Sequence, residues 1–323
     1  MIVLNLLIWT SVSVAGYKNV EKIRIATRQS TLALWQANYI KTLLESKWTG
    51  LQCEIIGMTT IGDRNKTAPL SDMGGKGVFV KELETALLEG NADIAVHSMK
   101  DVPGELPEGL RIMSIVERAS PRDAFVSNNF ASISDLPNGA KVGSSSLRRI
   151  RQLQHCRPEL EFVDLRGNVG TRLRKLDEGG YDGVILAVAG LTRLGLSDRI
   201  SEEISPDICL PAAGQGAIGI ESRLNDDLAT NLLGAINHAL THICVSAERQ
   251  VTRLLGATCQ LPVAVHADSN GRGFRLRAFV SNLSGDVVIK EEVIGELEDS
   301  GTLAVELGDY LLEQGAANLI AEQ

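Results

Sequence analysis

Apolar and polar positions alternate along the first two thirds of the chain in a rhythm of short strands and helices. The segment KIRIATR (22–28) predicts a strand, and after Ser30, a candidate N-cap, apolar residues recur at helical spacing from Leu32 to Leu43. Further strands are predicted at 53–60, 92–98 and 111–116, with a helix over 78–90.

The same rhythm restarts at AKVGSSSLRRIRQLQHC, continues in LEFVDLRGNVGTRLRKLDEGG and returns in GVILAVAGLTRLG. Strands that alternate with helices form βαβ units on a mostly parallel sheet. Two such series predict two α/β domains of similar kind.

The pattern changes near Ser246. A helix over 247–256 precedes the segment FRLRAFVSNLSGDVVIKEEVIG, which alternates on both sides of Ser-Gly-Asp and predicts a hairpin. A closing helix is expected over about 299–320. This third unit is therefore expected to be α+β and smaller than the other two.

Composition excludes some classes of function. The chain has 323 residues, 44% of them hydrophobic and only 4% aromatic, with a net charge of −8. Binding to nucleic acid or to an anionic membrane needs a basic surface, so neither is expected. The apolar start MIVLNLLIWTSVSVAG resembles a signal h-region but lacks a basic n-region, and its first Lys is Lys18. We interpret residues 1–19 as an extension and expect a cytoplasmic protein, with targeting as the alternative.

Five cysteines, an odd number without a C-x-x-C pair, argue against a disulfide framework or a zinc knuckle. Cys53, Cys156, Cys209 and Cys244 are expected to be small buried residues. Cys259 lies in GATCQLP, between a glycine-bearing turn and a proline, and its own surroundings do not separate a buried thiol from a reactive one.

Basic residues concentrate in 141–175, although the chain is acidic overall. The stretch GSSSLRR places serine hydroxyls and free N–H groups at a helix start, which favours an anion. Arg166 and Arg172 follow the next strand, at the edge where ligands of open α/β sheets bind. Arginine suits planar carboxylates, so a ligand with several carboxylates or phosphates is expected, the alternative being solvated helix faces.

The segment HSMKDVP (97–103) also leaves a strand. Lys100 and Asp101 have two interpretations. They are either a surface ion pair, or a functional pair in which Asp101 transfers protons and the Lys100 ammonium binds substrate anions. His97 has no second ligand at metal spacing, so it is interpreted as a packed strand residue and no metal is expected. A non-enzymatic anion receptor is the main alternative, but a carboxylate in its cleft would repel its ligand.

Two glycine motifs carry less weight. GQGAIG (214–219) matches a dinucleotide fingerprint only in spacing, because it does not follow the first strand and no acidic residue stands about 20 residues later. GGKG (74–77) lacks the first glycine and the Ser/Thr of a phosphate loop. It is interpreted as a mobile glycine hinge that carries Lys76.

Together these segments resemble one family, porphobilinogen deaminase, also called hydroxymethylbilane synthase. The matching stretches run in order from IRIATRQSTLALWQA through GGKGVFVKELE, AVHSMKDVP, GSSSLRR, DLRGNVGTRL, AVAGLTRLG and LPAAGQGAIGIE to CQLPVA. The resemblance implies a transferase that joins four porphobilinogen molecules head to tail and releases ammonia. It also implies a dipyrromethane cofactor bound to Cys259 through a thioether, and a monomer.

The resemblance further implies a fold and a set of site residues. The fold comprises two periplasmic-binding-protein-like α/β domains (20–117 with 217–236, and 118–216) and a smaller α+β domain (237–323). Asp101 is the expected catalytic residue, which assists ammonia departure and stabilises the charge on the ring. The expected cofactor-binding residues besides Cys259 are Ser98, Lys100, Ser144, Ser146, Arg148, Arg149, Arg166 and Gln215. The expected substrate-binding residues are Arg28, Ser30, Lys76, Arg172 and Arg193. Ala257 and Thr258 stand where many members have two glycines.

Overall fold

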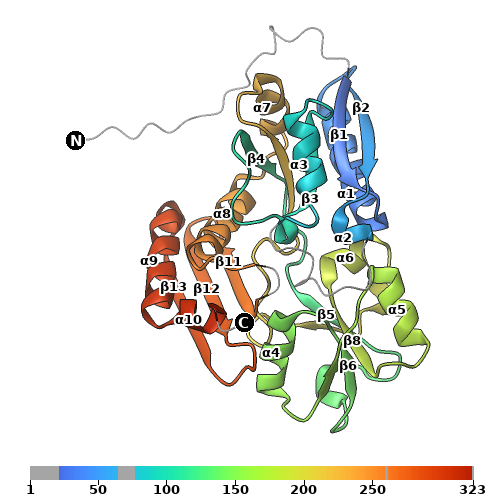
Figure 1. Cartoon of the computed structure of the whole chain (residues 1–323), viewed down its shortest axis with the longest axis vertical. Coiled ribbons are helices and arrows are strands. Elements are labelled where there is room, and N and C mark those ends of the chain that lie inside the picture. The colour runs from blue at the N-terminus through green and yellow to red at the C-terminus, as the bar shows by residue number, and fades with distance from the viewer. Residues whose placement is uncertain (1–21, 65–76, 259–260, 322–323) are drawn as a thin grey trace.

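The computed structural model describes residues 22–64, 77–258 and 261–321 and builds them around three sheets (Figure 1). The sequence predictions for residues 1–19, Lys76 and Cys259 lie outside the described residues. The strand predicted at 22–28 is β1, and the first predicted helix is α1 (Thr31–Lys47), capped by the Ser30 hydroxyl.

The first sheet has five strands in the order β2 (Gln52–Met58), β1 (Lys22–Arg28), β3 (Ile94–Ser98), β10 (Ile218–Arg223) and β4 (Leu110–Ile115). Helices α1 and α7 (Asp227–Gly234) pack on one face, and α3 (Lys81–Leu88) packs on the other. Both faces are therefore buried, which explains why β3 (IAVHS) is buried along four consecutive residues rather than at every second one.

The second sheet repeats this layout with β7 (Glu161–Val163), β6 (Lys141–Gly143), β8 (Gly183–Ala187), β5 (Asp123–Val126) and β9 (Glu202–Ile204). Its helices are α4 (Leu147–Cys156) on one face and α5 (Val169–Asp177) and α6 (Val188–Arg193) on the other. In each sheet the fourth strand of this order runs antiparallel to its two neighbours, so the prediction of mostly parallel sheets is confirmed with one reversed strand.

The reversed strands show how the chain crosses between the two sheets. It passes from β4 to β5 and returns from β9 to β10, so each sheet receives its reversed strand from the crossing segments. The two crossing segments pair with each other, because Val116 donates to Ile218 and Ala119 donates to Gly216. Gly216 has φ +87°, and a Cβ there would lie 2.5 Å from the Ala119 carbonyl oxygen. This repeated order, linked by a double crossing, confirms the predicted periplasmic-binding-protein-like fold.

The third sheet is antiparallel, with strands β11 (Val263–Ser269), β12 (Gly273–Ser281) and β13 (Val288–Glu296). The predicted hairpin is β12–β13, with Gly285 at φ +88° in its turn. Helix α8 (Ala239–Leu254), α9 (Ser300–Glu313) and α10 (Ala316–Ala321) share its core, so the predicted α+β class is confirmed. The prediction of a single closing helix was wrong, because Gly315 at φ +89° separates α9 from α10.

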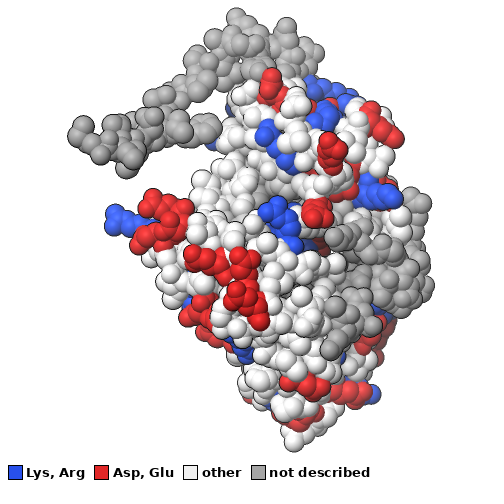
Figure 2. Space-filling view, turned by 60° about the vertical axis from the view of Figure 1, so that its left-hand side comes forward, with Lys and Arg blue, Asp and Glu red and all other residues white. Residues whose placement is uncertain are grey.

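The described surface and cysteines test two further expectations. Figure 2 shows acidic and basic side chains interspersed on one face without an extended basic area, in keeping with the net charge of −8. Cys53, Cys209 and Cys244 are buried as predicted, whereas Cys156 is exposed because it ends the outer turn of α4. Within the described ranges, no helix has the length and apolar character needed to span a membrane.

Candidate active site

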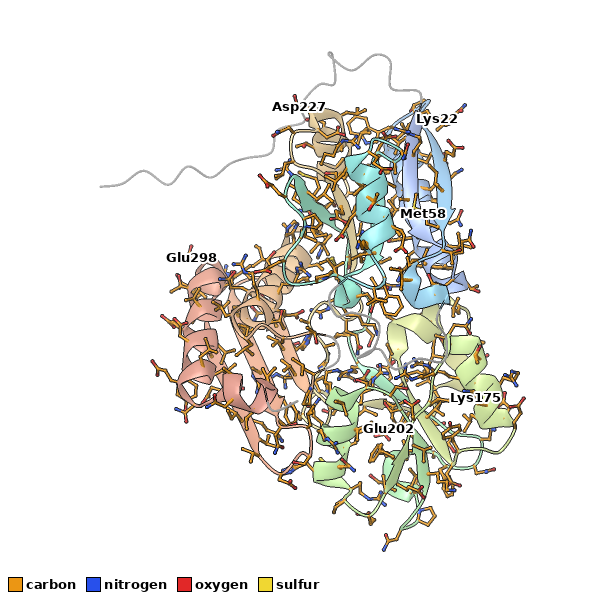
Figure 3. The ribbon with its side chains drawn as sticks, in the orientation of Figure 1. Lys22, Met58, Lys175, Glu202, Asp227 and Glu298 are labelled. Carbon is orange, nitrogen blue, oxygen red and sulfur yellow. The ribbon has the colours of Figure 1, made fainter. Side chains whose placement is uncertain are left out.

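The carboxyl ends of the parallel strands in the first sheet point toward the second sheet. Figure 3 shows Lys22, where β1 begins, at the far end, and Met58, where β2 ends, at the end nearer the second sheet. Arg28 pairs with Met58 in register, and β3 runs parallel beside β1. Side chains that follow β1 and β3 therefore meet at the edge where ligands of such sheets bind.

Arg28 and Asp101 meet at this edge. A short 3₁₀ turn (Met99–Asp101) follows β3 and brings the Asp101 carboxylate to 4.0 Å from Nη1 of Arg28. A small recess beside them is lined by residues that include Ser30, Gln36, Phe79 and Ser98. Gln36 of α1 and the Ser98 hydroxyl hydrogen-bond each other at 2.8 Å. The site thus has a half-buried carboxylate flanked by a guanidinium and by neutral donors.

Asp63 fixes the orientation of Arg28. It accepts hydrogen bonds from Nε and Nη2 of Arg28 at 3.1 and 2.5 Å, and the guanidinium lies over the Phe79 ring, 4.3 Å from its centroid. Burial alone would lower the pKa of Arg28, but the bonds to Asp63 and the charge of Asp101 outweigh it and raise that pKa. Arg28 is therefore permanently charged and held in place beside Asp101.

Arg148 and Arg149, predicted as anion ligands, lie in the first turn of α4 and point inward to Asp123. That carboxylate begins β5, is fully buried, and accepts from Nη1 of Arg148 at 2.8 Å and from Nε and Nη2 of Arg149 at 2.9 and 2.7 Å. Burial disfavours the charged carboxylate, but both arginines together hold the pKa of Asp123 well below its usual range. Sequence reasoning missed Asp123, although an aspartate at the head of the apolar strand in PRDAFV was a possible signal.

Gln215 connects this buried pair to the first sheet. Its amide nitrogen donates to Asp123 at 2.9 Å and to the Pro121 carbonyl at 2.7 Å, and its amide oxygen accepts from Nζ of Lys100 at 3.4 Å. Lys100 precedes Asp101 in the 3₁₀ turn, so a chain of polar contacts runs from the Asp101 turn to the arginines of α4. The structure thus brings together Lys100, Gln215 and Arg149, which are distant in sequence.

The charge of Arg149 acts on both Lys100 and Arg172, and we call these three residues together with Arg166 the cationic cluster. Burial, followed by repulsion from Arg149, lowers the pKa of Lys100 to about 8. Burial and then the charge of Arg149, with a smaller contribution from Arg166, lower the pKa of Arg172 to about 10, while Asp101 acts in the opposite sense. Buried cations with lowered pKa values beside a further cation favour the binding of an anion.

Serine residues border the cationic cluster. Ser144 is buried and its hydroxyl accepts from the backbone N–H of Ser146 at 3.2 Å, while Ser146 is the N-cap residue of α4. Arg166 contacts Asp164 at 3.1 Å, and Nε of Arg172 donates to the Gly167 carbonyl at 2.8 Å. The start of α4 and the turn after β7 therefore place hydroxyl groups and guanidiniums close to each other.

Arg193, predicted to bind substrate, has different neighbours. Its Nη2 donates to the Gly216 carbonyl at 2.6 Å, and its guanidinium lies 5.8 Å from the ring centroid of Trp35, which stacks on Tyr39. Burial lowers its pKa to about 10. These contacts tie α6 to α1 and to a crossing segment rather than to the cationic cluster.

His97 is a packed strand residue, as predicted. It is buried, and its Nε2 lies 2.9 Å from the Glu221 carboxylate on β10. No group of three or more potential metal-ligating side chains is found in the part of the chain that the structure describes.

Comparison with protein families gives two matches along this chain. Residues 23–231 match the family model described as porphobilinogen deaminase, dipyromethane cofactor binding domain, and residues 242–313 match the one described as porphobilinogen deaminase, C-terminal domain.

Among solved structures, a putative methionine-binding lipoprotein from Bacillus subtilis is 14% identical, with 68% of this chain and 90% of that chain covered and a TM-score of 0.42. A nutrient binding protein from Burkholderia cenocepacia bound to methionine is 15% identical, with coverage of 66% and 90% and a TM-score of 0.43. The periplasmic VFT2 domain of BvgS from Bordetella pertussis is 18% identical, with coverage of 67% and 87% and a TM-score of 0.40.

Proposed function

This chain belongs to the porphobilinogen deaminase family, and from that premise we propose how its own residues carry out the reaction. Members are hydroxymethylbilane synthases, transferases of tetrapyrrole biosynthesis that join porphobilinogen molecules head to tail with release of ammonia and carry a dipyrromethane cofactor. The observation that carries the residue assignments is the cationic cluster beside the Asp101 carboxylate.

The residues present fit the cofactor. A dipyrromethane carries acetate and propionate groups, and the pKa values of Lys100 and Arg172 are lowered by burial and by the charge of Arg149, so an anion bound there would stabilise their charged forms. When bound, the dipyrromethane supplies the primer on which the product grows. We assign its covalent attachment to Cys259 and its carboxylates to Lys100, Arg149, Arg166 and the hydroxyls of Ser98, Ser144 and Ser146. Arg148 and Gln215 support this set through Asp123 and Lys100.

Arg28, Ser30 and Arg172 are assigned to the carboxylates of the incoming porphobilinogen, with Lys76 and Arg193 as further substrate ligands. Asp101 is the catalytic residue: its carboxylate stabilises the positive charge that develops on the substrate ring as ammonia leaves, and then accepts the proton that the coupled ring releases. Arg28, 4.0 Å away, lies beside this carboxylate as its ion-pair partner.

We propose three domains, 20–117 with 217–236, 118–216, and 237–323, the last carrying Cys259, with residues 1–19 as an extension. The protein is further proposed to be a cytoplasmic monomer. The paired crossing segments near Gly216 support this division, since they are the covalent links between the first two sheets.

Intact-mass measurement of matched variants tests the assignment. The purified protein should be heavier than its bare polypeptide by one dipyrromethane, as should Cys156→Ala, whose exposed thiol is the control. Cys259→Ala should have the bare mass, and Asp101→Asn should keep the added mass yet lose nearly all turnover of porphobilinogen. A bare mass for the unsubstituted protein, or normal turnover by Asp101→Asn, would contradict the proposal.

A further inference from the structure

Helix α8 runs from beneath the first sheet to the segment that holds Cys259. Its N-cap residue His238 donates its backbone N–H to the Ile115 carbonyl of β4, and the helix ends at Leu254. Figure 1 shows α8 between the first sheet and the third sheet. Val245 of α8 shares a buried cluster with Met99 and Val102, which flank the Asp101 turn. One rigid element therefore contacts the turn that carries Asp101 and leads into the cysteine segment.

Arg249, one turn further along α8, holds that turn by its backbone. Its Nη1 donates to the Val102 carbonyl at 2.9 Å and its Nη2 donates to the Pro103 carbonyl at 2.6 Å. These are the two carbonyl groups that follow Asp101. The chain has left the sheet there, so these carbonyls need hydrogen-bond donors other than a neighbouring strand. A planar guanidinium that makes two such bonds fixes direction as well as distance, which a lysine does not.

The buried carboxylate of Glu221 acts on Arg249 electrostatically. Burial lowers the pKa of Arg249 to about 10, the charge of Glu221 opposes that shift, and the arginine stays cationic at neutral pH. The same Glu221 is hydrogen-bonded to His97, which lies four residues before Asp101 on β3. The Asp101 turn is therefore held at its start through His97 and at its end by Arg249.

We propose that Arg249 is a positioning residue, which fixes the Asp101 carboxylate relative to helix α8. This inference rests on the proposed role of Asp101. It extends that role, because it identifies the element that holds the catalytic carboxylate in place.

The matched pair Arg249→Met and Arg253→Met tests the inference, since Arg253 is an exposed arginine one turn later on the same helix. Arg249→Met should lower kcat by roughly ten- to hundred-fold with KM within about twofold, because small displacements of a catalytic group cost rate rather than binding. Arg249→Lys should lower kcat less than Arg249→Met does. Arg253→Met should keep the activity of the unsubstituted protein, and all three variants should keep the covalent mass.

Two further measurements separate positioning from general structural damage. In an Asp101→Glu background the carboxylate is already displaced, so adding Arg249→Met should cost much less than it does in the unsubstituted protein. Hydrogen exchange of the peptide covering residues 99–104 should accelerate in Arg249→Met and not in Arg253→Met, whatever the turnover.

Unchanged hydrogen exchange of residues 99–104 in Arg249→Met would overturn the inference. So would an equal fold-decrease in kcat on adding Arg249→Met to the unsubstituted protein and to Asp101→Glu. An unsubstituted protein that consumes no porphobilinogen would instead contradict the proposed function, and the exchange measurement would still decide whether Arg249 anchors the turn.

Discussion

Replacing Asp123 by Asn removes a buried negative charge while keeping the size and one acceptor oxygen of the side chain. In the native protein this carboxylate receives bonds from Arg148, Arg149 and Gln215, and its side chain has no exposed surface. Arg148 and Arg149 are themselves only 5% and 6% exposed. After the substitution, both guanidiniums would stay buried without a counter-charge.

The expected cost follows from that burial. Breaking a buried ion pair by removing one partner costs about 3–5 kcal/mol, because the remaining charge is left uncompensated. For a chain of 323 residues, a loss of this size lowers the thermal midpoint by roughly 4–8 °C. The pKa of Asp123 is depressed in the folded state, so the stability that its carboxylate contributes is complete above the ordinary carboxylate pKa near 4 and is lost as pH falls below it. The difference in free energy of unfolding between the unsubstituted protein and Asp123→Asn should therefore shrink in acid.

Chemical and thermal unfolding at pH 7 and at pH 3.5, followed by circular dichroism, measures both effects. Asp177→Asn is the matched control, because Asp177 also receives bonds from an arginine of the same sheet unit, Arg199, but is 47% exposed. Exposed pairs contribute at most about 1 kcal/mol, so this control should change little. If Asp123→Asn unfolded at the same denaturant concentration as the control, the idea that one carboxylate neutralises the arginine pair would be refuted.

Two other predictions test the first sheet and the crossing segments. Burial, reinforced by the charge of Glu221, raises the pKa of Glu84 to about 7, so the stability that its protonated form contributes is present below pH 4.5 and lost as pH rises through 7. From pH 4.5 to pH 8, Glu84→Gln should therefore gain roughly 1–3 kcal/mol relative to the unsubstituted protein in urea unfolding, and Glu89→Gln, at an exposed position, should gain none. Gly216→Ala should destabilise the protein by more than about 3 kcal/mol, because strain at positive φ adds to a clash with the Ala119 carbonyl. The control Gly50→Ala, at φ +90° in open space, should cost about 1–2 kcal/mol. Equal losses of stability in thermal unfolding would argue against close packing of the two crossing segments.

The strand-end residues were predictable because strand periodicity and sheet topology are enough to place them. Arg28 ends β1 and Asp101 lies in the turn after β3, and parallel neighbours end at one edge, which is why both residues, assigned to one cleft by the family resemblance, lie close together. The pattern also placed Arg172 after β7, where it interacts electrostatically with Arg149 and Asp101. Local pattern thus located the strand ends, and the ordered motifs indicated the family.

The partners of these residues were not predictable from local pattern. Arg148 and Arg149 meet Asp123 only because β5 enters its sheet reversed between β8 and β9, and no periodicity announces that reversal. Arg193 has the sequence context of a site residue, yet its bond to Gly216 depends on how the crossing segment passes α6. Cys156 was expected to be buried, but its position on the outer end of α4 leaves it exposed.

The proposed site contains cations that are paired with carboxylates and cations that are less fully compensated. Arg28 is matched by Asp63, and Arg148 and Arg149 share Asp123, so these arginines contribute geometry more than net charge. Burial lowers the pKa values of Lys100 and Arg172, and the charge of Arg149, which shares its carboxylate with Arg148, lowers both further. A carboxylate bound beside them would relieve that repulsion and so gain more than it would from a fully paired arginine. In the proposed function, Asp123 therefore orients the arginines without cancelling their charge, and Lys100 and Arg172 supply the positive charge that pyrrole carboxylates require.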